Sequence, residues 1–295
     1  MKGLAENKNV LHLIQSRMSD FSKSQKKIAA YILERYDEAP FVTAAKLGQT
    51  VGVSESTVVR FASELGYGGY PEMQKAIGEA MRSQLTAAQR VSVTSGRVEN
   101  GNVLDYVLAS DMNNIRSSLE QIKRADFEKI VDAIVQAKNI YILGVRSSAS
   151  LASFFGFYLN LISPNVRNVR AGTSSELFEE ILRIDEGDVF IGISFPRYSK
   201  RTLKAIDYAK SRGATVISIT DRPSSPIAVA ADLCLTALSD MASFVDSLVA
   251  PLSVINALLV AISMKKQEDI VETLEQLEQI WDEYEVYEKF GTEGK

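Results

Sequence analysis

The stretch 44–65, AAKLGQTVGVSESTVVRFASEL, contains two short helical patterns with a turn between them. The spacing predicts one helix over 44–51 and a second over 55–65. Gly52 stands where the turn needs a positive φ, and Gly48 is small where the two helices approach each other closely. The facing apolar side chains of the pair are Leu47, Val51, Val53, Val58, Phe61, Ala62 and Leu65.

This is the spacing of a DNA-binding helix-turn-helix, with the motif over 44–63. In such a motif the start of the second helix enters the major groove, where hydroxyls contact phosphates or base edges and an arginine contacts guanine. Free backbone N–H groups at that helix start also favour a phosphate. A helical hairpin with a polar surface has the same spacing, so the pattern alone leaves both interpretations open. The residues expected to face DNA are Ser54, Glu55, Ser56, Thr57 and Arg60.

The similarity reaches beyond the motif. Residues 41–76 resemble the DNA-binding domain of the RpiR family of bacterial transcriptional regulators. The resemblance is carried by VVRF at 58–61, LGY at 65–67 and a further aromatic residue, Tyr70. It implies that an all-α helix-turn-helix domain over 8–84 binds double-stranded operator DNA.

The second half of the chain follows a different pattern. From about residue 130 to 265, β-branched runs alternate with helical runs, which is typical of βαβ units and a parallel sheet. We expect an α/β domain over 126–267, a polar linker and a connecting helix over 85–125, and a helical tail over 268–295. The connecting helix, 103–121, is expected to pack onto the second domain. The predicted strands are 139–145, 166–169, 188–194, 215–220 and 232–236.

The first predicted strand runs into a turn that can bind an anion. Gly144 is followed by Arg146, Ser147 and Ser148, and a long helix begins there. Helix-start N–H groups and serine hydroxyls donate to phosphate oxygens, and the arginine adds positive charge. Ordinary N-capping by serine explains the same residues. The turn lacks the glycines of a dinucleotide fingerprint and the Gly-Lys-Ser/Thr of a P-loop.

A second turn of the same kind follows the strand 188–194. It contains Ser194, Arg197, Ser199 and Thr202, and it again opens a helix. Because both turns lie at the carboxyl ends of parallel strands, we expect them to converge on one phosphorylated ligand. Arg197 has an alternative role as the partner of a local carboxylate. Lys200 and Arg201 are expected on the solvated face of the new helix.

The second half resembles the sugar isomerase (SIS) fold that accompanies the RpiR DNA-binding domain. This resemblance implies that Ser147, Ser148, Ser194, Ser199 and Thr202 are the hydroxyls that hold a sugar phosphate. The chain departs from the usual Ser-x-Ser-Gly-x-Thr loop, because residues 196–198 (Pro-Arg-Tyr) are inserted and Lys200 replaces the glycine. The implied effector is therefore a phosphorylated sugar or a related acidic metabolite, and Arg197 favours one with a second acidic group.

Enzymatic functions find less support in the residues. A sugar-phosphate isomerase is the main alternative, and it needs a histidine or a placed carboxylate for proton transfer. The only histidine, His12, lies in the N-terminal helices, which leaves Glu176, Glu179 or Glu180. Glu176 follows two serines that look like a helix cap, so its carboxylate has a structural explanation. A nucleotide-binding module lacks every glycine-rich fingerprint, and no cluster has metal-ligand spacing. We therefore expect a regulator, not an enzyme, with no cofactor.

The totals agree with a two-domain regulator. The chain has 295 residues and a net charge of −4, but residues 1–95 carry 12 Lys/Arg against 9 Asp/Glu. The single cysteine, Cys234, cannot form an internal disulfide and is expected in a buried strand. There is no signal-peptide pattern, and the apolar run 248–264 is expected to be a buried helix. We expect a soluble, cytoplasmic protein without a membrane partner.

The C-terminal tail bears on assembly. Ile270, Leu274, Leu277, Trp281 and Tyr284 recur at alternating steps of four and three residues, which is a heptad-like seam. A final helix lying on its own domain and a contact between subunits are both compatible with this pattern. Because helix-turn-helix proteins commonly bind palindromic operators in pairs, we expect a homodimer or homotetramer.

Overall fold

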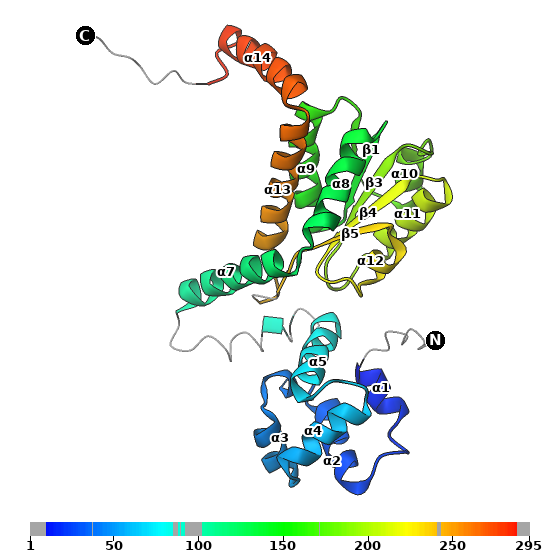
Figure 1. Cartoon of the computed structure of the whole chain (residues 1–295), viewed down its shortest axis with the longest axis vertical. Helices are drawn as coiled ribbons and strands as arrows, with labels where there is room; N and C mark the ends of the chain where they lie inside the picture. Colours follow the sequence, from blue (N-terminus) through cyan, green and yellow to red (C-terminus); the bar gives the residue numbers. More distant parts are fainter. Residues whose placement is uncertain are drawn as a thin grey trace, which may run out of the picture. The chain divides into compact units, whose positions relative to one another are not determined.

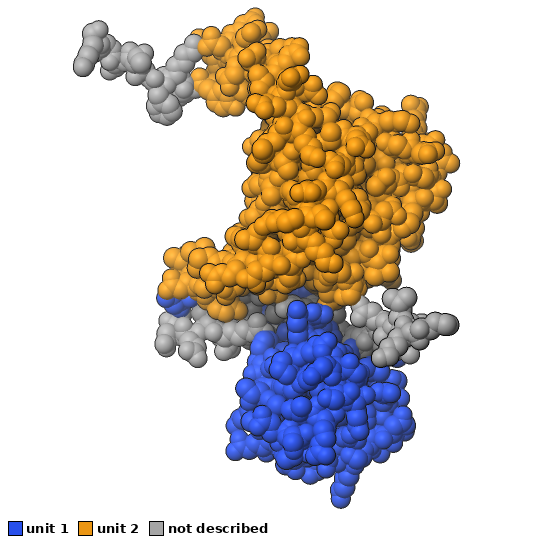
Figure 2. All heavy atoms as spheres, in the orientation of Figure 1, with its two compact units in different colours: residues 1–103, 241–245 blue, residues 104–240, 246–295 orange. Residues whose placement is uncertain are grey.

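A computed structural model describes residues 10–36, 38–84, 88, 90–91, 102–170, 172–240 and 243–287. The chain divides into two compact units (Figure 2). Unit 1 comprises Met1–Val103 and Met241–Val245, and unit 2 comprises Leu104–Asp240 and Asp246–Lys295. Each unit has a hydrophobic core of its own.

Unit 1 is built from short helices around one core. Helix α2 begins at a capping box in which Ser22 accepts from the Gln25 backbone N–H and the Gln25 side chain accepts from the Ser22 N–H. Phe21 and Phe61 pack edge to face in the core, with ring centroids 5.1 Å apart. The elements are α1 (Val10–Ser16), α2 (Lys23–Glu34), η1 (Ala39–Phe41), α3 (Ala44–Val51), α4 (Glu55–Glu64) and α5 (Tyr70–Gln84).

Unit 2 contains a parallel five-stranded sheet in the order β2-β1-β3-β4-β5. All five strands lie within the predicted segments, so the expected α/β class is confirmed. Cys234 lies on a strand, β5, as expected, but both the residue and most of this strand are half-buried, not buried. The strands are β1 (Ile140–Gly144), β2 (Val166–Asn168), β3 (Val189–Ile193), β4 (Thr215–Thr220) and β5 (Leu233–Thr236).

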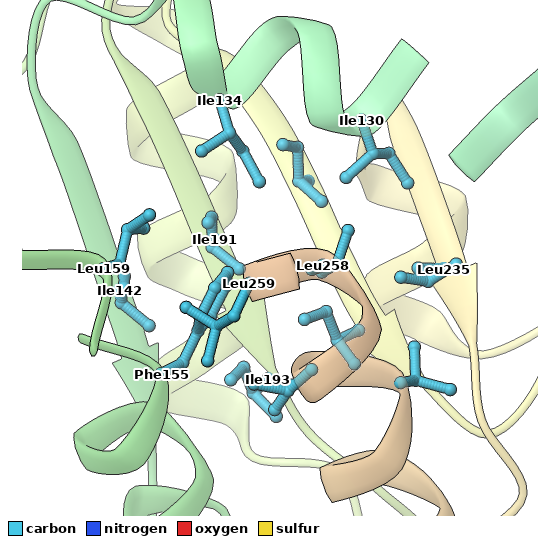
Figure 3. Close-up of a cluster of buried hydrophobic side chains, with 14 of the residues drawn as sticks. Ile130, Ile134, Ile142, Phe155, Leu159, Ile191, Ile193, Leu235, Leu258 and Leu259 are labelled. Carbon is cyan, nitrogen blue, oxygen red and sulfur yellow. The ribbon is translucent and has the colours of Figure 1, made fainter. Parts of the chain in front are cut away.

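Helices cover both faces of this sheet because the central strands are apolar on both sides. On β1, Ile142 belongs to one buried cluster and Leu143 to the other. The first cluster packs under α8, α9 and α13, where Figure 3 shows Phe155 and Leu258 against the sheet residues. Its helices are α8 (Arg124–Gln136), α9 (Ser148–Ile162) and α13 (Val249–Lys265); α10 (Ser174–Glu180), α11 (Lys200–Ser211) and α12 (Pro226–Ala230) cover the opposite face.

Two further helices border unit 2 (Figure 1). Helix α7 (Val103–Gln121) packs onto the domain as expected, since Ser118 Oγ accepts from the Leu238 N–H at 2.8 Å and Ser247 Oγ donates to Asp111 Oδ1 at 2.5 Å. Helix α14 (Gln267–Glu283) contacts α9 through its first turns, yet none of its residues is buried. The seam of the tail is therefore only partly covered by its own domain.

The apolar run 248–264 forms most of α13, which lies in the core of unit 2, as expected. Within the described residues, no helix is by itself long and apolar enough to cross a membrane. Helices α13 and α14 meet such a requirement only when they are taken together across a bend of 100°, and only by length and composition.

Candidate functional site

The helix-turn-helix motif closes on two glycines. Gly52 has φ 71° and caps α3 in the left-handed conformation, as the turn was expected to require. A Cβ atom on Gly48 would lie 2.8 Å from the Val53 carbonyl oxygen, so only glycine fits between α3 and the turn. The predicted apolar residues Leu47, Val58 and Phe61 are fully buried between these helices.

The polar start of α4 forms a small hydroxyl cluster. Ser54 is its N-cap and accepts from the Thr57 N–H at 3.3 Å. Its Oγ lies 2.9 Å from Ser56 Oγ and 2.8 Å from Thr57 Oγ1. Glu55, Ser56 and Arg60 are exposed on the same helix. The five residues expected to face DNA thus all lie at the N-cap and in the first two turns of α4.

The two predicted anion turns lie side by side in unit 2. Strands β1 and β3 are neighbours in the sheet although β2 separates them in the chain. The order 2-1-3-4-5 reverses at this pair, and ligands of open α/β sheets bind at the carboxyl ends of the strands flanking such a reversal. The turns after β1 and β3 therefore occupy the position that this architecture favours for a ligand.

Helix α9 begins directly above the end of β1. A Cβ atom on Gly144 would lie 2.1 Å from the Ser148 carbonyl oxygen, so glycine is required where the strand passes under the helix. This close approach brings the first turn of α9 and its backbone N–H groups over the strand end. Ser148 is buried there, whereas Arg146 and Ser147 are exposed.

Both turns carry an arginine in the left-handed region. Arg146 has φ 60° and Arg197 has φ 63°, and Glu285 is the only other non-glycine residue with positive φ in the described part of the chain. An L-residue in this conformation costs on the order of 1–2 kcal/mol, which the surrounding structure must offset. Such residues concentrate at ligand sites, where strain holds a side chain in a required place.

A cavity of about 420 Å³ lies between the two turns. It is strongly basic, and Asp246 is its one acidic lining residue. Six of the seven predicted ligand residues line it: Arg146, Ser147, Ser148, Ser194, Arg197 and Ser199. Lys200 and Arg201, which were expected on a solvated face, also line the cavity while remaining exposed.

The seventh residue, Thr202, does not line the cavity. It is fully buried beneath the first turn of α11, and its Oγ1 has no hydrogen-bond partner in the described structure. Its backbone N–H instead donates to Ser199 Oγ at 3.3 Å, which makes Ser199 the N-cap of α11. Ser194 Oγ accepts from the Ser199 N–H at 3.0 Å and so closes the base of the turn.

Ser147 differs from Ser199 in this respect. It occupies the N-cap position of α9, but its φ and ψ are helical (−60° and −34°) and its side chain forms no capping hydrogen bond. The alternative explanation of Ser147 as an ordinary N-cap is therefore wrong. Ser147 is exposed and lines the cavity.

Glu176 has a structural role. The cap of α10 is Thr173, not the serine pair that the sequence suggested. Thr173 and Glu176 form a capping box, in which the Glu176 carboxylate accepts from the Thr173 N–H at 2.7 Å. Glu180 similarly accepts from the Arg170 N–H at 2.8 Å.

Sequence reasoning missed two features of the site. Asp246 reaches the cavity from the segment before α13, far along the chain from both turns. Tyr198, treated only as part of an insertion, donates through its hydroxyl to Asp221 Oδ1 at 2.8 Å. Burial raises the pKa of both the Tyr198 phenol and the Asp221 carboxyl. The sequence signal that could have pointed to Tyr198 was the presence of an aromatic residue within a polar turn.

Comparisons with known proteins match both units. Residues 8–84 match the family model described as a helix-turn-helix domain of the rpiR family. Residues 133–261 match the model of the SIS domain. An uncharacterised HTH-type transcriptional regulator of Caldanaerobacter subterraneus subsp. tengcongensis is 28% identical over 283 residues, which cover 92% of this chain and 96% of that protein.

Two solved structures are also similar. The sugar isomerase domain of an RpiR transcription factor from Sphaerobacter thermophilus is 29% identical, with a TM-score of 0.56 and coverage of 59% of this chain and 96% of that one. The Vibrio vulnificus NanR protein, solved in complex with ManNAc-6P, is 22% identical with a TM-score of 0.57, covering 92% and 99%. The similarity to NanR shows that the two proteins share a fold.

Proposed function

Because the chain belongs to the RpiR family of transcriptional regulators, with a helix-turn-helix domain followed by a SIS domain, we propose that an acidic metabolite controls its binding to an operator. The effector is a phosphorylated sugar or a related acidic metabolite, and it binds in the cavity between the turns after β1 and β3. The observation that carries the proposal is that this cavity collects serine hydroxyls and arginines at the reversal point of a parallel sheet.

The lining suits a phosphate. Ser147 and Ser194 supply hydroxyls, and the positive end of the α9 helix dipole lies beside them. Arg146 adds a cation that is always charged and can bind phosphate through two hydrogen bonds. The NanR structure, which has the same fold and holds ManNAc-6P, supports a phosphorylated sugar as the type of ligand.

Binding without turnover fits these residues better than isomerisation. The only histidine of the sequence, His12, lies in unit 1. The Glu176 and Glu180 carboxylates already accept backbone hydrogen bonds, and neither lines the cavity. Proton transfer at a sugar carbon would need a base within hydrogen-bond reach of the ligand, and Asp246 is the one carboxylate among the described lining residues.

The start of α4 is the part of the protein that recognises the operator. Its exposed polar residues would enter the major groove, with Arg60 contacting a base edge and the hydroxyls of Ser54, Ser56 and Thr57 contacting phosphate. Regulation then requires that effector binding favours one arrangement of the DNA-binding domains over another.

We further propose that the protein works as a homodimer. Helix α7 exposes an apolar stripe on which Leu104 and Met112 are 68% and 64% exposed, with Leu108, Ile115 and Leu119 continuing it. Beside the stripe, α7, α8 and α13 form a largely apolar groove of about 550 Å³, lined in part by Leu119, Phe127 and Met264. A ridge and a groove on one subunit match the self-complementary interface of a two-fold dimer.

The first experiment combines an effector search with DNA binding. A duplex operator is selected from random double-stranded DNA with the full chain, and a panel of sugar phosphates and phosphorylated sugar acids is screened by thermal shift. An effector present at about 100 times its Kd should stabilise the protein by roughly 2.7 kcal/mol. The same compound should change operator affinity.

The variant Ser147→Ala links the response to the site. Loss of one hydrogen bond to a charged phosphate should weaken effector binding by roughly 10- to 100-fold. Ser150→Ala, on the exposed side of the same helical turn and outside the cavity lining, is the matched control and should leave the affinity unchanged. An effector response that survives Ser147→Ala undiminished would place the pocket elsewhere.

A further inference from the structure

The inserted residues 196–198 are tied to the neighbouring strand. Tyr198 donates through its hydroxyl to Asp221 Oδ1 at 2.8 Å, and Asp221 immediately follows β4. The residue Asp221 is only 9% exposed. The insertion is therefore anchored across the sheet, from the turn after β3 to the end of β4.

Asp221 is itself held in place. Thr220 Oγ1 donates to the same Oδ1 atom at 3.2 Å, and Arg222 Nε lies 3.9 Å from Oδ2. The Arg222 guanidinium also lies 6.0 Å from the centre of the Tyr198 ring. Because burial raises the pKa of Tyr198, its hydroxyl keeps the proton that it donates. The hydrogen bond to Asp221 and the contact between Arg222 and the Tyr198 ring thus fix the position of Tyr198.

The other end of the loop is closed by serines. Ser194 Oγ accepts from the Ser199 N–H at 3.0 Å, which joins a residue before the inserted segment to the residue that follows it. Arg197 lies between this closure and the Tyr198 anchor. It is exposed, has φ 63° and lines the cavity. A left-handed L-residue persists only where its surroundings enforce it, and these two attachments do so.

The charge of the cavity indicates what Arg197 is there to bind. Four basic side chains line it, against the single carboxylate of Asp246. A phosphate monoester carries a charge of about −1.5 to −2 at neutral pH, so Arg146 and Lys200 are enough to balance one phosphate, and Arg197 is left to bind a second anionic group. A carboxylate on the ligand would be such a group, and arginine binds a carboxylate through two parallel hydrogen bonds. The basic lining residues are Arg146, Arg197, Lys200 and Arg201.

We infer that the Tyr198–Asp221 hydrogen bond is a positioning device that holds Arg197 at the cavity, and that Arg197 there selects effectors carrying a carboxylate as well as a phosphate. The inference rests on the proposed function, since it concerns the same cavity. Arg197 contacts the ligand, whereas Tyr198 and Asp221 act through it.

A matched pair of probes tests the selection. Glucose 6-phosphate and 6-phosphogluconate differ at C1, which is the hemiacetal carbon of a closed ring in the first compound and a carboxylate on an open chain in the second. The comparison with Arg197→Ala then separates the effect of the carboxylate from that of the ring. Titration calorimetry with the full chain should show tighter binding of 6-phosphogluconate, by about 10-fold or more, as expected for a hydrogen bond to a charged group. Arg197→Ala should remove this preference and leave the affinity for glucose 6-phosphate within about threefold.

Variants of Tyr198 and Asp221 distinguish a role in positioning Arg197 from a role in protein stability alone. Tyr198→Phe should lower the preference about as much as Arg197→Ala, and adding it to Arg197→Ala should change nothing more. Asp221→Asn keeps an oxygen acceptor at the same place and should retain the preference, whereas Asp221→Ala should lose it. A purely structural role for Tyr198 would instead weaken both ligands equally and persist in the Arg197→Ala background.

The outcomes distinguish this inference from the function on which it rests. Equal affinity for the two probes in the wild-type protein, or a preference untouched by Arg197→Ala, would overturn the selection by Arg197 and leave an effector-controlled regulator. A preference untouched by Tyr198→Phe would overturn the role of the anchor. Failure of the wild-type protein to bind any phosphorylated sugar or sugar acid would overturn the proposed function, and this inference with it.

Discussion

At the scale of single residues, the side chains at the start of α4 are of two kinds: short hydroxyls that hydrogen-bond to one another, and one long arginine, Arg60. The hydroxyls of Ser54, Ser56 and Thr57 lie within 2.9 Å of one another in two pairs, and Ser54 also caps the helix. Arg60 lies one turn further along the exposed side, with its Nε 3.4 Å from the Ser56 carbonyl oxygen. A long guanidinium one turn beyond a cluster of hydroxyls is suited to reach a base edge.

Arg60→Ala is therefore expected to reduce operator affinity by about 1–3 kcal/mol and to relax sequence preference at one base pair. The thermal stability should stay within about 0.5 kcal/mol, because the side chain is exposed. Fluorescence anisotropy with the selected operator measures the first effect. Arg35→Ala, which removes an exposed arginine paired with Glu38 outside the motif, is the control. Equal losses for both variants would remove Arg60 from the reading surface.

At the scale of elements, close approaches decide where helices begin and how they meet. Gly144 lets α9 start above the end of β1, and Gly48 lets α3 pack against the turn before α4. In both places the nearest atom is a backbone oxygen, which cannot rotate away as a side chain does. The packing of α3 against the turn before α4 therefore depends on the absence of a Cβ atom at Gly48.

Gly48→Ala should destabilise unit 1 by about 1–3 kcal/mol, since the new Cβ would meet the Val53 oxygen at 2.8 Å. Gly78→Ala is the matched control in the middle of α5. Its Cβ would meet Pro40 at an ordinary 3.5 Å, so the change should stabilise the helix by roughly 0.5–1 kcal/mol. Scanning calorimetry of the full chain follows the transition of this domain. A stabilising Gly48→Ala would contradict the close approach seen here.

At the scale of the whole molecule, the unexplained feature is the apolar stripe of α7. Leu104, Leu108 and Met112 project from a helix that packs on its domain only through other positions, such as the buried Asn114 and Ser118. Contiguous exposed apolar surface of this kind marks an interaction site. A second copy is the occupant we propose, because a palindromic operator requires two DNA-binding domains.

Leu108→Glu combined with Met112→Glu should convert a dimer into a monomer, since four charges would face one another across a two-fold axis. Sedimentation velocity at micromolar concentration measures the change, and operator affinity should fall with it. Val229→Glu alters another largely exposed apolar residue, on α12, and should leave the assembly unchanged. A monomeric wild-type protein, or a double variant that still dimerises, would refute the interface.

Much of this protein is determined by short-range sequence pattern. The capping box at Ser22, the paired helices around Gly52 and the five strands were all predictable, because the residues that specify each one lie within a few positions of one another. Six of the seven predicted ligand residues also line the cavity, because strand ends in a parallel sheet share one edge. The seventh, Thr202, was predicted at the cavity but is buried in the core, because a helix-start hydroxyl faces either the ligand or the core and packing decides which.

Only the tertiary structure decided what lies between the turns. The strand order places β3 beside β1, and no local pattern encodes a neighbour reached across β2 and α10. Tyr198 finds its acceptor 23 residues away, and Asp246 enters the cavity from beyond β5. The left-handed φ of Arg197 likewise follows from attachments outside the residue itself. Periodicity reports which face of an element is buried, whereas partners distant in sequence are fixed only when the sheet assembles and the helices pack on it.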